Sequence, residues 1–158
     1  MVRELTGDWP GASRRYLVFS LMLHLVWEIV QLPLYTLWRT GSLRELSFAV
    51  LHCTTGDLMI AGLSLLLAIV VVGDLRWPIS SARSVWLLTL LLGAGYTIYS
   101  EWLNVNVRGS WAYSDLMPTL PVLGTGLAPL LQWLVVPTLG QCVAIRRRPW
   151  ADPIGRTS

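Results

Sequence analysis

Four apolar runs dominate the sequence, and each is long enough to cross a lipid bilayer as a helix. They cover about residues 16–37, 47–72, 85–103 and 125–145, and about 20 helical residues span the hydrocarbon core. Charged residues make up only 13% of the chain, against about 25% in soluble domains. The sequence therefore predicts an all-α fold: a polytopic membrane four-helix bundle forming one integral membrane domain over residues 1–158, with an outer loop at 104–124.

The distribution of arginine predicts how this bundle is oriented, because positive charge favours cytoplasmic loops. The chain has no lysine, and the first and third connections hold only three of its twelve arginines. The other nine lie in the terminal segments and the second connection: Arg3, Arg14, Arg15, Arg76, Arg83, Arg146, Arg147, Arg148 and Arg156. We therefore expect a multi-pass protein of a bacterial inner membrane with both termini cytoplasmic. A net charge of +3 gives no reason to expect nucleic acid as a partner.

The first run carries a stripe of polar residues: Ser20, His24, Glu28, Gln31 and Tyr35 follow 4-4-3-4 spacing. On a helix they fall within an arc of about 80°. Unpaired polar groups in lipid cost several kcal/mol each, so this stripe is expected to face the other helices or a wet cavity. Hydrogen bonding between helices would also account for such a stripe.

Two further carboxylates lie within apolar runs. Asp57 belongs to the segment that begins at His52, and Glu101 closes the third run. Ionisable residues within spans are costly, roughly 2.5–3.5 kcal/mol at a helix centre on insertion scales, and they mark functional sites by default. Counting 1.5 Å per residue predicts that these groups and the stripe form a polar column in the outer half of the bundle.

The outer loop and the fourth run add polar and aromatic groups near this column. Trp111 and Tyr113 suit a loop that lies in the interface as a lid, and Gln132 lies about two turns into the fourth run. The sequence thus predicts an outward-facing intramembrane pocket that binds, or acts on, a hydrophobic lipid-like molecule, with membrane lipid as the partner. Candidate acid–base residues are His24, Glu28, Asp57 and Glu101. Candidate substrate contacts are Gln31, Tyr35, Trp111, Tyr113 and Gln132.

Other functions fit the same residues. Histidine and carboxylates from several helices can build a metal centre, whose ligands would be His24, Glu28, His52, Asp57 and Glu101. Buried carboxylates can also serve as proton sites in transport, and so small a bundle would then need to form a homo-oligomer. A role as an assembly subunit of a membrane complex is a further alternative. The residues identify neither an enzyme nor a cofactor.

Two resemblances accompany this pattern. The His-x-x-x-Glu pair His24–Glu28 is similar to the His and Glu pair of emopamil-binding, sterol-isomerase-like membrane proteins, which implies chemistry on a membrane-dissolved substrate. The whole chain resembles a family of small bacterial four-helix integral membrane proteins that brings no activity with it. That resemblance rests on the segments His24–Tyr35, His52–Asp57, Trp111–Tyr113 and Gly126–Trp133, together with Glu101 and Met117-Pro118.

Overall fold

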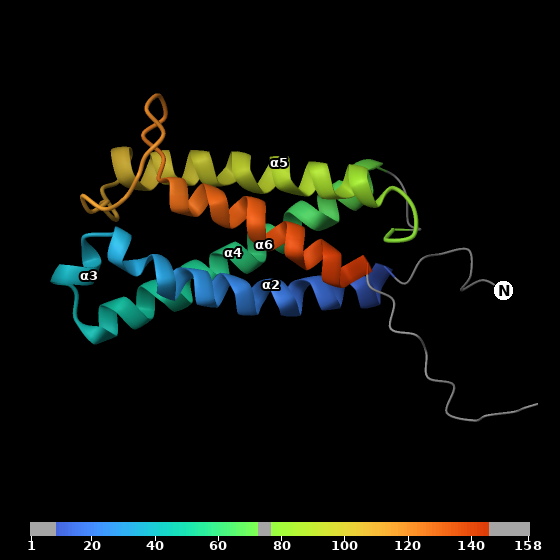
Figure 1. Ribbon diagram of the computed structural model, residues 1–158, viewed down its shortest axis with the longest axis horizontal. Coiled ribbons are helices and arrows are strands. Elements are labelled where there is room, and N and C mark those ends of the chain that lie inside the picture. Colours follow the sequence, from blue (N-terminus) through green and yellow to red (C-terminus); the bar gives the residue numbers. More distant parts are fainter. Residues whose placement is uncertain (1–8, 73–76, 146–158) are drawn as a thin grey trace, which may run out of the picture.

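The computed structural model describes residues 9–72 and 77–145, and this part of the chain is all-helical, without a β-strand. Three helices are long and apolar enough to cross a membrane, over Trp9–Leu34, Leu43–Val72 and Leu127–Ile145. The elements in chain order are α2 (Trp9–Gln31), η1 (Leu32–Leu34), α3 (Leu37–Thr40), α4 (Leu43–Val72), α5 (Ala82–Glu101), the π-helical η2 (Trp102–Val107) and α6 (Leu127–Ile145) (Figure 1).

Helix α2 differs from the predicted first span at both limits. Of the described residues, it is helical from Trp9 onward, seven residues before the predicted start. The regular helix ends at Gln31 because Pro33 follows within the next turn, and a proline ring clashes with the preceding turn of a helix. The third run continues helically to Val107, so the predicted outer loop begins later than residue 104.

Helix α5 is 20 residues long but is not one of the three helices that meet the membrane criteria. Thr89, Gly93 and Thr97 lie on its buried face, and these residues lower its mean hydropathy. The prediction of four apolar spans is therefore confirmed for three of the helices, and α5 is the exception.

The four long helices pack in a ring. α2 contacts α4 and α6, and α5 contacts the same two helices from the other side. Figure 1 shows the beginning of α2 and the end of α6 at one end of the molecule, and α3 with the segment between η2 and α6 at the opposite end.

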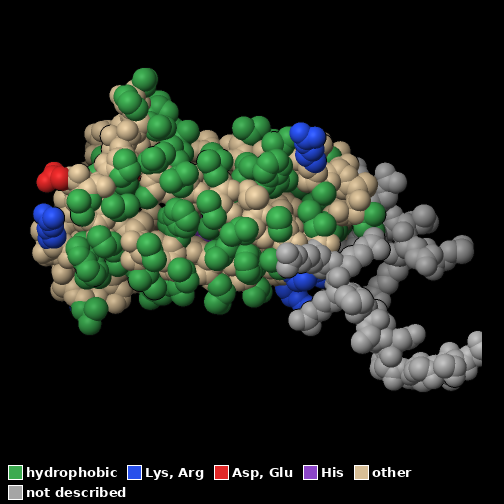
Figure 2. All heavy atoms as spheres, viewed as in Figure 1, with side chains coloured by type: hydrophobic (Ala, Val, Ile, Leu, Met, Phe, Trp, Pro, Cys, Tyr) green, Lys and Arg blue, Asp and Glu red, His purple; other side chains and the backbone are tan. Residues whose placement is uncertain are grey.

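The interior of this ring holds an apolar core together with the polar side chains of α2, and apolar side chains cover its outside. Every fourth residue of α2 is buried, with Gln31 closing the series: Ala12, Tyr16, Ser20, His24, Glu28 and Gln31. On the opposite face of the same helix, Val18, Met22 and Val26 are each more than half exposed. Figure 2 shows hydrophobic side chains along the length of the visible face, with charged side chains near the two ends. Exposed apolar area of this extent is compatible with a surface that meets lipid, and the burial of the stripe residues confirms that the stripe on α2 faces inward.

Two glycines allow α6 to approach its neighbours closely. A Cβ on Gly93 of α5 would lie 2.1 Å from Cε3 of Trp133, and a Cβ on Gly140 would lie 2.9 Å from the Tyr16 ring. Small residues serve the same purpose in other membrane helix pairs. These contacts fix which face of α6 is turned toward α2, and so they place Gln132 inside the ring.

Candidate functional site: a cavity with two polar clusters

A cavity of about 1140 Å³ lies at the end of the ring that is remote from the described termini. All four long helices contribute to its wall, and exposed residues such as Arg44 and Arg108 lie at its rim. Apolar groups in the wall include Leu32, Phe48 and Ile60. The polar and aromatic lining residues are Glu28, Gln31, Tyr35, Ser42, Arg44, Glu45, His52, Cys53, Asp57, Tyr96, Thr97, Ser100, Glu101, Asn104, Arg108, Ser110, Trp111, Gln132 and Trp133.

The amide of Gln132 is the centre of the first polar cluster. Its Nε2 lies 2.8 Å from Nδ1 of His24, 3.1 Å from Oε1 of Glu28 and 2.8 Å from Oδ2 of Asp57. His24 Nδ1 lies 3.4 Å from the same oxygen of Asp57, and Gln31 Nε2 donates to Glu28 Oε1 at 2.7 Å. Three helices, α2, α4 and α6, thus bring one imidazole, two carboxyls and two amides together.

Only part of this cluster faces the cavity. Glu28, Asp57 and Gln132 line the wall, whereas His24 is fully buried and does not. The imidazole is covered by the indole of Trp133, with ring centroids 5.6 Å apart. Its Nε2 has no hydrogen-bond partner. His24 can therefore reach a ligand only through the groups in front of it.

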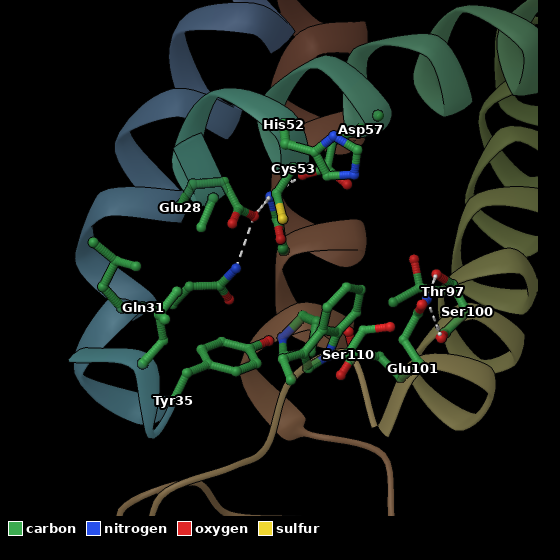
Figure 3. A pocket seen from close by; sticks show the side chains of 18 of the residues that line it. Glu28, Gln31, Tyr35, His52, Cys53, Asp57, Thr97, Ser100, Glu101 and Ser110 are labelled. Carbon is green, nitrogen blue, oxygen red and sulfur yellow. Dashed lines mark hydrogen bonds between the residues drawn. The ribbon is translucent and has the colours of Figure 1, made fainter. Parts of the chain in front are cut away.

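The second polar cluster lies on the facing side of the cavity (Figure 3). The Tyr113 hydroxyl donates to Oε2 of Glu101 and accepts a 2.9 Å hydrogen bond from the Gly126 N–H. Burial, and then the Glu101 carboxyl, raise the pKa of Tyr113, so the phenol stays neutral and keeps donating. Trp111 is a further neighbour of this carboxyl.

The outer loop is held in place by the junction between η1 and α3. The Thr36 N–H donates to Ala112 O at 3.0 Å, and the Ser114 N–H donates to Leu34 O at 2.9 Å. Tyr35 and Tyr113 form an isolated bridge between these bonds, with their rings 5.7 Å apart. The loop thereby forms one wall of the cavity, which carries Trp111.

The structure brings some of the predicted site residues together and separates others. His24, Glu28, Asp57 and Gln132 form one contact group, with Gln31 beside it, while Glu101 and Tyr113 form another. His52 is exposed at the rim, where its ring stacks on Phe48 at 5.5 Å. Tyr35 and Trp111 lie in the wall.

The five candidate metal ligands are accordingly not assembled around one point. In the described residues, no group of three or more His, Cys, Asp and Glu side chains could hold a metal ion. The amide nitrogen of Gln132 occupies the point on which His24, Glu28 and Asp57 converge, and His52 lies apart from it.

Sequence reasoning did not single out several residues of the wall. Cys53 lies in it beside Asp57 of the same helix, and Trp133 both lines it and covers His24. The position of Trp133 could have been predicted, because it follows Gln132 directly. Consecutive residues of a helix lie only 100° apart, so both can face the same space.

Comparison with known proteins adds no assignment. No protein family, curated protein or solved structure matches the chain.

Proposed function

We propose that the chain is a four-span protein of a bacterial inner membrane that binds, or acts on, a hydrophobic lipid-like molecule in this cavity. The arginine distribution supports cytoplasmic termini. On that orientation the cavity, which lies at the end remote from the described termini, opens toward the outer face. Helix α5 then crosses the membrane with its polar and small residues turned toward α4 and α6.

The observation that carries the proposal is the cavity itself. Ligand sites usually measure about 300–1000 Å³ and combine apolar walls with a few convergent polar groups. A cavity of about 1140 Å³ is large enough for a polar head and part of a hydrocarbon chain. Leu32, Phe48 and Ile60 supply apolar wall, and Glu28 and Asp57 lie on one side with Glu101 facing them.

The lining groups favour a ligand that donates hydrogen bonds. Glu28, Asp57 and Glu101 all line this space, and a carboxyl oxygen that carries no proton accepts hydrogen bonds. A hydroxyl or amine head group between the two clusters would find acceptors on both sides. Arg44 and Arg108 at the rim add positive charge at the level where lipid phosphates lie.

The chemistry that the wall offers to such a ligand is proton transfer. A carboxyl within hydrogen-bond reach of a reacting atom can act as a general acid or base. Glu28 and Asp57 meet this requirement for a molecule that fills the cavity, and Glu101 meets it from the facing side. His24 would act as a positioning residue for Asp57 rather than as a ligand contact.

Native mass spectrometry of the protein released from mild detergent tests the binding proposal. Gly56 lines the cavity, and a Cβ there would meet no atom within 4 Å, so Gly56→Phe is expected to place its ring in the cavity space. Gly95 has equally open surroundings but does not line the cavity, and Gly95→Phe is the matched control. We expect retained lipid in the wild type and in Gly95→Phe, and its loss in Gly56→Phe. Equal retention in all three would refute binding in the cavity.

A further inference from the structure

The first polar cluster has fewer hydrogens than its contacts need. A side-chain amide carries two N–H donors, yet three acceptor atoms lie within 3.1 Å of the Gln132 nitrogen. These acceptors belong to His24, Glu28 and Asp57. If both carboxyls are ionised and Nδ1 of His24 is unprotonated, one of the three short contacts has no hydrogen in it.

Turning the amide of Gln132 over does not remove this deficit. The nitrogen and oxygen of such a group are assigned from their partners, so the opposite orientation must be considered. It would place an oxygen within 3.1 Å of Oε1 of Glu28 and Oδ2 of Asp57, and each of those contacts would then need a proton on the carboxyl. Both orientations are short of at least one hydrogen.

The surroundings do not compensate for this shortage with a fixed cation. In the described part of the chain, no arginine lies within ion-pair distance of Glu28 or Asp57, and His24 is the one ion-pair partner recorded for Asp57. The titratable groups around the pair are His24 on α2, Cys53 on α4, Glu101 on α5 and Tyr35 after η1. Helix α6 contributes the amide of Gln132. Two ionised carboxylates that approach the same amide nitrogen repel each other where burial limits their hydration, and each further carboxylate nearby raises that cost.

We propose that His24, Glu28, Asp57 and Gln132 form a proton-binding site that holds one exchangeable proton shared by the carboxyls of Glu28 and Asp57. Uptake forms one O–H bond on a carboxyl oxygen, and the proton comes from hydronium in the cavity. Release breaks that bond and returns the proton to water. Because both carboxyls line the cavity and His24 lies behind them, the proton exchanges through the cavity and does not cross the ring.

This proton-binding site does not depend on the identity of a ligand. A molecule that fills the cavity would cover both carboxyls and separate them from water, so occupancy and proton exchange would be linked. The cluster would then sense whether the cavity is filled.

Infrared difference spectroscopy of the full chain in lipid bilayers tests the proposal. When the pH of the bathing buffer is raised, the wild type is expected to lose one carbonyl-stretch band of a protonated carboxyl, and that band shifts in D₂O. Glu28→Gln is expected to abolish the band and keep the fold, because the new amide supplies the missing hydrogen permanently. Asp57→Asn is expected to abolish it in the same way.

Glu45→Gln is the matched control, because Glu45 is exposed at the rim. It is expected to leave the band unchanged. Should either inner variant fail to fold, carbon-13 labelling of glutamate or aspartate carboxyls in the wild type assigns the band instead. A wild type without any titrating carboxyl band overturns the proposal, and so does a band that survives in both Glu28→Gln and Asp57→Asn.

Discussion

A methyl group at Gly93 tests whether the packing of α5 on α6 positions the cluster. The Cβ of Gly93→Ala would lie 2.1 Å from Cε3 and 2.3 Å from Cζ3 of Trp133, whereas ordinary van der Waals contact begins at 3.4 Å. The indole or the helix must therefore move by more than about 1 Å. Trp133 is 1% exposed and its ring contacts the His24 ring, so its movement would disturb that imidazole.

The expected cost follows from this overlap. Overpacking of a well-packed interior costs about 1–3 kcal/mol, and a chain of this size loses about 2–4 °C of melting temperature per kcal/mol. Gly95 lies two residues further along the same helix, and a Cβ there meets nothing within 4 Å. Gly95→Ala is therefore expected to be neutral or to stabilise by about 0.5–1 kcal/mol through helix propensity.

Thermal unfolding of both variants in the same detergent, followed by circular dichroism, separates these outcomes. Gly93→Ala should melt earlier than the wild type, and Gly95→Ala should not. Gly93→Ala combined with Trp133→Phe should recover part of the loss, because the smaller ring vacates the contested space, and the recovery measures the coupling of the pair. Equal melting of Gly93→Ala and Gly95→Ala would refute the close contact of α5 with Trp133.

Two further predictions concern the loop and the opening of the cavity. Tyr113→Phe removes the hydroxyl that donates to Glu101, which should lower the free energy of unfolding by about 1–3 kcal/mol because a buried group is left unpaired. Amide hydrogen exchange in the outer loop should become faster, whereas Tyr99→Phe on an exposed ring should change neither quantity. Unchanged exchange in Tyr113→Phe would show that the hydroxyl does not hold the loop. Cys53 lines the cavity and Cys142 does not. In a Cys142→Ser background, a membrane-impermeant maleimide should therefore label Cys53 only from the outer face. Labelling from the cytoplasmic face alone would reverse the proposed orientation.

The sequence predicts much of the inward-facing pattern because lipid makes one choice unavoidable. A polar stripe at spacing four on an apolar helix can only face inward, and the buried residues of α2 confirm this, His24 and Glu28 among them. Helices of membrane-spanning length are confirmed at three of the four runs. They could be predicted because length and hydropathy are properties of each segment alone.

The remaining features depend on contacts between helices, which no single segment specifies. Gln132 becomes the centre of the cluster only because Gly93 and Gly140 let α6 approach α5 and α2. The buried face of α5 carries Thr89 and Gly93 beside Thr97, and which neighbour each of them meets is set by the packing of the helices.

The most direct test of the proposed binding is a crystal structure of the protein grown from a lipid mesophase. The proposed function predicts elongated density inside the cavity, with its polar end within hydrogen-bond distance of Glu28, Asp57 or Glu101 and its apolar end beside Phe48 and Ile60. A cavity closed by protein side chains, or one that holds water alone, would contradict the proposal that this chain binds a lipid-like molecule.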